Sequence, residues 1–355
     1  MGVEDVAAGH MDAEMGGGGG EEALVEAGTC TYTKIEKLQE SGVNVADIAK
    51  LKAAGFCTTN AIVSVMRKDL VAVKGLGEAK VDKIIEAAYK TVSGEKSQFF
   101  TAEEALVKLQ QVRFKISTGA SSLDEILRGG IEAGCITELY GEFRCGKTQL
   151  CHTLAVMAQL HETFPGRCLY IDTEGTFRPD RIQEICVAQN VDPEEIMANI
   201  ITARAMTSEH LNALLREAAT MMVDESSGQF AVIIIDSIMG IFRQDFSGRG
   251  ELSERQQLLG KTLNRLAKLA HEFNVAVVLT NQVMADPSGS VGATFSAMPK
   301  PIGGHVLAHA STVRLFFRKG KGDERIVKII DSPNLPEAEC TVQIFSGGIR
   351  APEGM

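Results

Sequence analysis

One glycine-rich stretch, residues 141–148, constrains the fold more than any other part of this sequence. Its sequence is Gly-Glu-Phe-Arg-Cys-Gly-Lys-Thr, which fits the pattern of a glycine, four residues, a second glycine, a lysine and a threonine. That spacing builds a loop whose backbone N–H groups surround a phosphate chain, and glycines allow the close approach. Lys147 is expected to reach the β- and γ-phosphates, and the Thr148 hydroxyl is expected to ligate Mg²⁺.

The flanks of this loop provide the context that a phosphate site needs. Residues 136–140 alternate as in a β-strand, and residues 149–155 have the pattern of a helix whose N-terminus faces the phosphates. The sequence therefore predicts a nucleotide-binding α/β domain. The residues expected to contact the nucleotide are Gly141, Glu142, Phe143, Arg144, Cys145, Gly146, Lys147, Thr148 and Gln149.

Charge and composition exclude several classes of protein. The formal charge of the 355 residues is −10, of which residues 1–30 contribute −7. Any contact with nucleic acid therefore has to come from local basic clusters. The eight cysteines include no C-x-x-C spacing, which favours a reduced intracellular protein without a disulfide framework or zinc site. No apolar run has membrane-spanning length, so we expect no membrane partner.

Changes in composition divide the chain into four expected parts. Residues 1–29 are acidic and include a five-glycine run, which predicts a disordered tail. Residues 30–90 have helical spacing of apolar residues, and residues 31–96 carry a net charge of +3. Residues 91–113 are predicted to form a linker, and residues 114–355 alternate strand and helix patterns.

The pattern of residues 114–355 predicts a mostly parallel sheet. Residues 232–236 form a continuous apolar run that ends in Asp236, which is typical of a central strand buried on both faces. Strand patterns after residue 305 predict an antiparallel extension. Ligand sites of open α/β sheets lie beyond the carboxyl ends of their strands. Asp236 is therefore expected to hold Mg²⁺ through water, next to Thr148.

Two further strand ends carry side chains that suit nucleotide hydrolysis. Glu174 follows an apolar strand and is positioned to polarise the water that attacks the γ-phosphate, with a turn-capping acid as the plain alternative. Gln282 follows the strand predicted over 275–280, and its amide is expected to sense the γ-phosphate. A loop rich in glycine, serine and proline comes next, over residues 283–304, and loops of that length are usually functional or disordered.

Two regions suit contact with DNA. The turn Gly75-Leu76-Gly77 lies between helical segments beside lysines, as in a helix-hairpin-helix that presents backbone N–H groups to a phosphate. A plain hairpin in a small helical bundle fits that pattern equally well. Residues 243–255 hold three arginines around a phenylalanine and glycines. That combination suits phosphate contact with base stacking, or equally a solvated basic turn.

Taken together, the motifs of residues 30–355 resemble those of the eukaryotic RecA-like DNA strand-exchange recombinases. The resemblance rests on residues 141–149, on Asp-Thr-Glu-Gly-Thr-Phe-Arg at 172–178, on Asp-Phe-Ser-Gly-Arg-Gly-Glu-Leu at 245–252, and on residues 301–312. This family has a general repair branch and a meiosis-specific branch. The segments that resemble the meiotic branch are 207–210, 237–239, 285–287 and His305. Those that resemble the repair branch are 151–156, Gly175 and 335–339. The balance favours the meiotic branch.

The resemblance implies roles for individual residues. Lys147, Glu174 and Gln282 are implied to serve ATP hydrolysis, with Thr148 and Asp236 on Mg²⁺. The residues implied to contact DNA are Arg243, Phe246, Arg249, Arg255, Phe295, Gly303, Gly304, Gly75 and Gly77. The residues implied to contact a neighbouring protomer are Phe99 and Ala102, as a Phe-x-x-Ala motif, and His309 and Asp331, which reach the neighbour's ATP.

The chain also departs from the family pattern at two places. Cys145 stands where the family commonly has threonine, so oxidation of this thiol would block nucleotide entry. The loop after Gln282 carries extra residues before Phe295, and it has a single Lys300 where the family usually has two lysines. From composition alone, the adjacent phenylalanines at 99 and 100 favour packing on their own domain over insertion into a neighbouring molecule, and the resemblance reverses that preference.

We therefore expect an α/β fold: a RecA-like P-loop ATPase core with a mostly parallel central sheet, preceded by a small all-α helix-hairpin-helix domain. The implied function is that of an ATP-dependent recombinase in the nucleus. It would form helical filaments or rings, bind single-stranded and double-stranded DNA, and exchange strands in meiosis with the help of recombination mediator proteins. The alternatives are a general repair recombinase, a non-exchanging mediator paralogue, a ring-forming helicase and a P-loop kinase.

Overall fold

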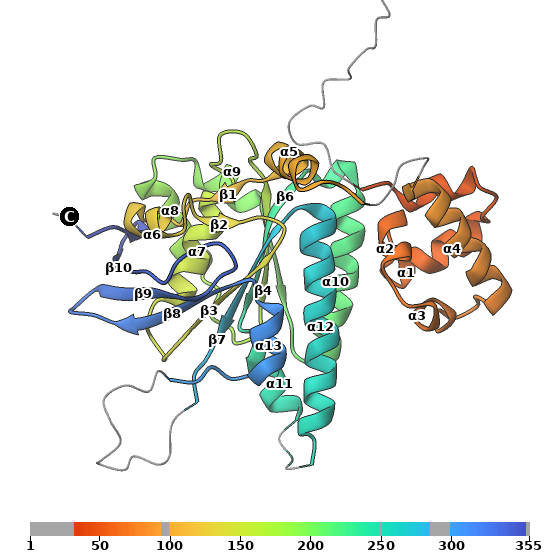
Figure 1. The fold of residues 1–355 in the computed structure, drawn as a ribbon. Coiled ribbons are helices and arrows are strands. Elements are labelled where there is room, and N and C mark those ends of the chain that lie inside the picture. Colours follow the sequence, from red (N-terminus) through yellow and green to blue (C-terminus); the bar gives the residue numbers. More distant parts are fainter. Residues whose placement is uncertain (1–31, 94–98, 247, 249, 285–298, 353–355) are drawn as a thin grey trace, which may run out of the picture.

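The computed structural model describes residues 32–93, 99–246, 248, 250–284 and 299–352. These residues form a large α/β unit and a smaller all-helical unit beside it (Figure 1). The predicted fold class is confirmed, because a mostly parallel sheet follows a small helical unit. No helix among the described residues is both long enough and apolar enough to cross a membrane.

The small unit packs short helices around an apolar centre that includes Leu38, Leu51, Leu70 and Val81. Its elements are η1 (Ile35–Gln39), α1 (Val45–Ala53), α2 (Thr59–Val63), α3 (Arg67–Val71) and α4 (Glu78–Ser93). The turn between α3 and α4 contains Gly75, whose φ of +85° strains any side chain. The predicted helical hairpin around Gly75-Leu76-Gly77 is therefore present.

Among the described residues, nine strands form one sheet in the order β11-β10-β9-β8-β3-β7-β6-β4-β5. Neighbouring strands from β8 to β5 are parallel, whereas β8, β9, β10 and β11 pair antiparallel, which confirms the expected extension. The strands are β3 (Ile136–Gly141), β4 (Arg167–Asp172), β5 (Ile200–Arg204), β6 (Phe230–Asp236), β7 (Ala276–Asn281), β8 (Val313–Lys319), β9 (Glu324–Asp331), β10 (Glu339–Phe345) and β11 (Gly348–Arg350). A separate pair consists of β1 (Lys115–Ile116) and β2 (Ile131–Glu132).

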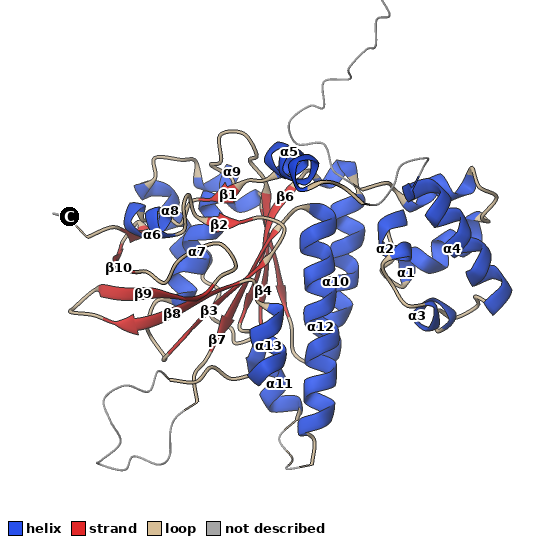
Figure 2. Cartoon of the chain, in the orientation of Figure 1, coloured by secondary structure: helices blue, strands red, loops and turns tan. Residues whose placement is uncertain are grey.

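Helices cover both faces of the sheet (Figure 2). Val232 and Ile234 of β6 belong to the core that includes Leu154 of α7, while Ile233 and Ile235 point to the core on the α10–α12 side. All of β6 is buried, as its continuous apolar run predicts. The helices are α5 (Ala102–Val112), α6 (Ser121–Ile126), α7 (Lys147–Met157), α8 (Pro179–Ala188), α9 (Pro193–Ala198), α10 (Ser208–Val223), α11 (Ile238–Asp245), α12 (Leu252–Phe273) and α13 (Gly304–Ala310), with a 3₁₀ turn η2 (Glu225–Ser227).

Helix α5 lies inside the segment expected to be a linker, residues 91–113. A capping box explains its start: the Thr101 hydroxyl accepts the Glu104 N–H, and the Glu104 carboxylate accepts the Thr101 N–H. No side chain of α5 is buried, so this helix lies on the surface of the protomer. The segment before it, residues 94–98, lies outside the described residues.

The helical unit is seated against the α10–α12 side of the core. Thr58 donates a hydrogen bond to Glu272, and Lys268 Nζ donates to the carbonyl oxygen of Ser64 over 2.8 Å. Burial raises the pKa of the Glu272 carboxyl above its usual value. A buried carboxyl needs a donor to remain satisfied, so the Thr58 hydroxyl anchors the small unit at this point.

Candidate functional site

A cavity of about 690 Å³ lies at the carboxyl ends of the central strands, against the 141–148 loop. It contains most of the residues expected to bind the nucleotide, including Lys147, Thr148, Glu174, Asp236 and Gln282. Sequence patterns missed another of its walls. That wall is formed by Arg181, Glu184, Asp323, Arg325, Ile344, Phe345 and Ser346. These residues belong to α8 and to the β9–β10 region, which only the tertiary fold brings to the loop.

The glycines of the 141–148 loop are required by close backbone packing. A Cβ on Gly141 would lie 2.2 Å from the carbonyl oxygen of Phe317, and Gly146 has a φ of +99° where α7 begins. Lys147 Nζ donates to the carbonyl oxygens of Gly141 and Glu142, each over 2.8 Å. The ammonium group therefore lies against the loop, as expected for a residue that holds phosphate oxygens.

Cys145 is fully buried in the same loop. Its sulfur accepts a hydrogen bond from Lys147 Nζ over 3.4 Å. The thiol thus contacts the lysine expected to bind phosphate. Position 145, where cysteine replaces the threonine common in the resembled family, therefore lies at this cavity.

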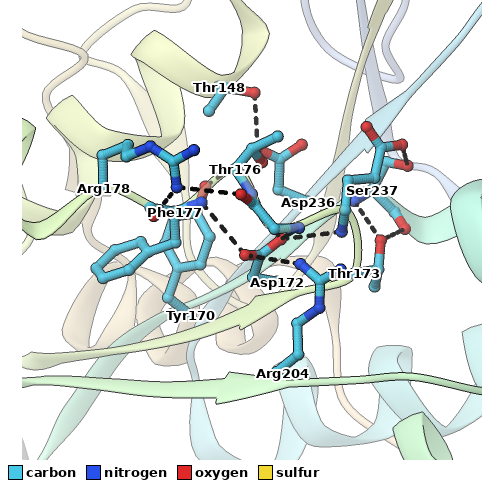
Figure 3. Close-up of polar contacts among 12 residues, drawn as sticks. Thr148, Tyr170, Asp172, Thr173, Thr176, Phe177, Arg178, Arg204, Asp236 and Ser237 are labelled. Atoms are coloured by element: carbon cyan, nitrogen blue, oxygen red, sulfur yellow. Dashed lines mark hydrogen bonds and ion pairs between the residues drawn. The ribbon is translucent and has the colours of Figure 1, made fainter.

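The carboxylate of Asp236, at the end of β6, gathers hydroxyl donors from several elements (Figure 3). Thr148 Oγ1 donates to Oδ2 over 2.7 Å, Tyr170 OH donates to the same oxygen over 3.1 Å, and Thr280 donates to Oδ1. Only 4% of Asp236 is exposed. Hydroxyl and carboxylate oxygens are the ligands that a hard cation such as Mg²⁺ prefers, so Thr148 and Asp236 fit the expected metal.

Glu174 belongs to a second hydrogen-bonded chain that runs away from the nucleotide loop. Its Oε1 accepts hydrogen bonds from Ser237 Oγ over 2.6 Å and from Gln282 Nε2 over 3.0 Å. Gln282 Oε1 in turn accepts a hydrogen bond from Arg243 over 3.1 Å. Glu174, Gln282 and Arg243 also line a cavity of about 500 Å³. This series of hydrogen bonds connects the expected catalytic carboxylate of Glu174 to the region expected to contact DNA.

The capping role considered for Glu174 belongs instead to Asp172, a function that sequence patterns missed. Asp172 ends β4 and is largely buried, and Arg204 forms an ion pair with it over 3.1 Å (Figure 3). Its carboxylate accepts the backbone N–H groups of Glu174 (2.9 Å), Gly175 (2.7 Å), Thr176 (3.2 Å) and Phe177 (3.2 Å). The turn that carries Glu174 is therefore fixed by the neighbouring acid. An aspartate followed by a glycine-containing turn was the available signal.

His152 supports the same turn from behind. Its ring lies 5.7 Å from the Tyr170 ring and 5.6 Å from the Phe177 ring, and its Nε2 accepts the Arg178 N–H. Burial lowers the pKa of His152 to about 4. The imidazole is therefore neutral at physiological pH and acts as an apolar support with one acceptor.

The residues expected to contact DNA fall in separate places. Arg243 lies on α11, Phe246 follows it and packs against the α10–α12 core, and Arg255 lies on α12. Gly303 and Gly304 begin α13, whereas Gly75 and Gly77 lie in the turn of the helical unit. Arg249 and Phe295 lie outside the described residues.

The four residues expected at a protomer interface are all on the surface. Phe99 is 92% exposed, and Ala102, His309 and Asp331 are exposed as well. None of the four is among the residues that line the 690 Å³ cavity. A single protomer therefore does not bring His309 and Asp331 to its own nucleotide site.

Comparison with known proteins identifies two regions. A model described as Rad51 matches residues 109–352, and a model described as a SAM-like helix-hairpin-helix tandem matches residues 34–90. The meiotic recombination protein DMC1/LIM15 homolog of Homo sapiens is 53% identical over 322 residues, covering 90% of this chain and 93% of that protein. The meiotic recombination protein DMC1 homolog of Glycine max is 52% identical over 321 residues, which is 90% of each chain.

Replacing Asp172 tests whether it positions Glu174. The Asp172→Asn substitution removes the negative charge that holds Arg204, and the new amide accepts the N–H groups of the turn more weakly than the carboxylate does. Misplacing a catalytic group by about 1 Å can cost roughly 100-fold, so we expect kcat for ATP hydrolysis to fall by at least about tenfold. The KM for ATP should change by less than about threefold, because the 141–148 loop is untouched.

Asp180→Asn, at an exposed aspartate on α8, is the matched control and should retain wild-type kcat. An unchanged kcat in a folded Asp172→Asn protein, checked by thermal unfolding, would show that the cap does not position Glu174.

Proposed function

This chain belongs to the Rad51 family, and we propose that it is an ATP-dependent DNA recombinase that pairs homologous DNA molecules and exchanges their strands in meiosis. The similarity to meiotic recombination proteins extends over 90% of the chain. This similarity agrees with the meiotic branch of the family, which the sequence motifs favour.

The observation that carries this proposal is the linkage of a nucleotide site to expected DNA contacts. Glu174 accepts a hydrogen bond from Gln282, and Gln282 accepts one from Arg243, the first arginine of the basic segment 243–255. Gln282 also immediately precedes the segment 283–304, which is rich in glycine, serine and proline. A kinase or a simple nucleotide hydrolase has no need for such a connection, whereas a DNA-dependent ATPase requires one.

In this proposal the chain's own groups divide the work of ATP hydrolysis. Lys147 and the backbone of the 141–148 loop bind the phosphates, and Thr148 and Asp236 hold Mg²⁺. When bound, Mg²⁺ neutralises charge on the phosphate oxygens. Glu174, held by Ser237 and Gln282, orients and polarises the attacking water. A turn of Glu174 towards that water would break its bond to Gln282 and leave the Gln282 amide, to which Arg243 donates, free to move.

The nucleotide site is proposed to be completed by a second copy of the chain. His309 and Asp331 are exposed and lie away from the cavity of their own protomer, as expected if they serve a neighbour. A repeated head-to-tail contact of this kind produces open helices, or rings when the rotation closes. ATP at each junction would then stabilise the filament by binding the assembled state more tightly than the separate protomers.

The Phe99 motif needs an acceptor on a second copy of the chain. Strand β5 lies at the edge of the sheet, and an open edge accepts an added strand through backbone hydrogen bonds. Beside it, Ile201 of β5 and Leu214 and Met221 of α10 are apolar and only partly buried. We propose that Phe99 enters this apolar surface and that Ala102 packs at its rim.

Single-stranded and double-stranded DNA are the proposed partners, with the nucleus as the place of action. Phosphate contacts would come from the 243–255 segment and from the helical turn at Gly75 and Gly77, whose backbone N–H groups read no sequence. Recombination mediator proteins are further proposed partners, because a filament on DNA has to be nucleated against competing proteins.

A strand-exchange assay tests the function directly. The wild-type protein with ATP and Mg²⁺ should form joint molecules from single-stranded DNA and homologous duplex. Lys147→Arg should lower the rate of ATP hydrolysis by about 100-fold, because the Lys147 ammonium group is expected to stabilise charge on the phosphates in the transition state. Heterologous duplex is the control and should give no joint molecules. A wild-type protein that binds DNA and ATP but forms no joint molecules would favour the mediator paralogue instead.

Phe99→Glu tests the assembly. A charge at this position should prevent insertion into an apolar surface, so the variant should sediment as a folded monomer. It should still bind ATP through the 141–148 loop, but more weakly than the assembled wild type. Phe100→Glu is the matched control, since Phe100 is only 53% exposed and contacts Lys108 of its own protomer. Filaments of unchanged length in Phe99→Glu, measured by electron microscopy, would contradict the assigned contact.

A further inference from the structure

Helix α13 carries two histidines one turn apart. His305 and His309 are both exposed, their ring centroids lie 6.0 Å apart, and the angle between the ring planes is 23°. The His-Val-Leu-Ala-His spacing places both imidazoles on the same face of the helix. In Figure 1, α13 lies next to α12 and α11.

We propose that His305 and His309 together bind a divalent transition metal ion such as Zn²⁺. Two histidines at positions i and i+4 of a helix are a recurrent zinc-binding arrangement, because both ring nitrogens can point at one ion. Neutral imidazole suits Zn²⁺, Ni²⁺ and Cu²⁺, which lie between hard and soft cations. The rings lie within reach of one ion, and rotation about their side-chain torsions would bring one nitrogen of each to it.

This site differs in chemistry from the Mg²⁺ site at Thr148 and Asp236. That site offers oxygen ligands, which suit hard cations, whereas the α13 pair offers nitrogen ligands only. Among the described residues, no group of three or more histidine, cysteine, aspartate or glutamate side chains could hold a metal ion. The histidine pair therefore supplies two ligands, with water in the remaining positions, and the site stays open to solvent and exchangeable.

Metal binding would have a consequence that rests on the proposed function. His309 is proposed to reach the nucleotide of a neighbouring protomer, and an imidazole nitrogen that ligates Zn²⁺ is no longer available for that contact. Helix α13 also packs against α12: a Cβ added to Gly260 of α12 would lie 3.5 Å from Val306 of α13. An ion held between residues 305 and 309 would therefore fix His309 on its own helix and lower ATP hydrolysis in the filament.

Calorimetric titration of tag-free, nucleotide-free, full-length protein with ZnCl₂ tests the binding site. Losing an outer partner of a metal ligand already costs 10- to 100-fold in affinity, so His305→Asn should weaken Zn²⁺ binding by at least about tenfold. His271→Asn, at an exposed histidine on α12, should bind Zn²⁺ as the wild type does. Equal affinity in wild type and His305→Asn would overturn the site and direct attention to partly exposed thiols such as Cys135 and Cys340.

The regulatory consequence has its own readout. With free Zn²⁺ set by a metal buffer, DNA-stimulated ATP hydrolysis should fall in the wild type and remain unchanged in His305→Asn. Equal inhibition of both proteins would overturn the consequence. If the wild type hydrolyses no ATP in the presence of DNA, the proposed function fails. The calorimetric comparison still decides the metal site in that case, because it requires neither nucleotide nor DNA.

Discussion

The buried carboxylate of Asp236 is the interaction on which the rest of the site depends. A charged group at 4% exposure has to be surrounded by donors, and Asp236 obtains them from hydroxyls on α7, β4 and β7. These bonds fix the start of α7 to three adjacent strands of the sheet. The orientation of the 141–148 loop therefore follows from satisfying one acid at the end of β6.

The next residue in the chain begins a different network. Ser237 donates to Glu174, which is joined through Gln282 to Arg243. Two consecutive residues thus belong to two chains of hydrogen bonds, one directed to the nucleotide loop and the other to the expected DNA contacts. Both networks start at the end of β6. A change at the γ-phosphate can therefore reach the expected DNA contacts through few hydrogen bonds. Such a path couples two sites only if it has two alternative arrangements.

The sequence predicted the parts of this site that depend on local patterns. The loop at 141–148 and the acids at strand ends follow from spacing and from the rule that ligands bind beyond those ends. The cavity wall at 344–346 could not be predicted, because it depends on how the antiparallel extension folds back. The cap formed by Asp172 was missed, because two acids near one strand end could not be told apart without the backbone geometry. Helix α5 lies in the segment 91–113, which its polar start at 93–98 assigns to a linker, and none of its side chains is buried in the protomer.

We infer that Gln282 transmits the state of the nucleotide to the expected DNA contacts. The most direct measurement is the affinity for single-stranded DNA with a non-hydrolysable ATP analogue and with ADP, at one salt concentration, in wild type and Gln282→Ala. Coupling between sites of this kind is typically about 5- to 150-fold. We expect a ratio in that range for the wild type and a ratio near one for Gln282→Ala. Wild-type coupling that persists in Gln282→Ala would contradict this inference.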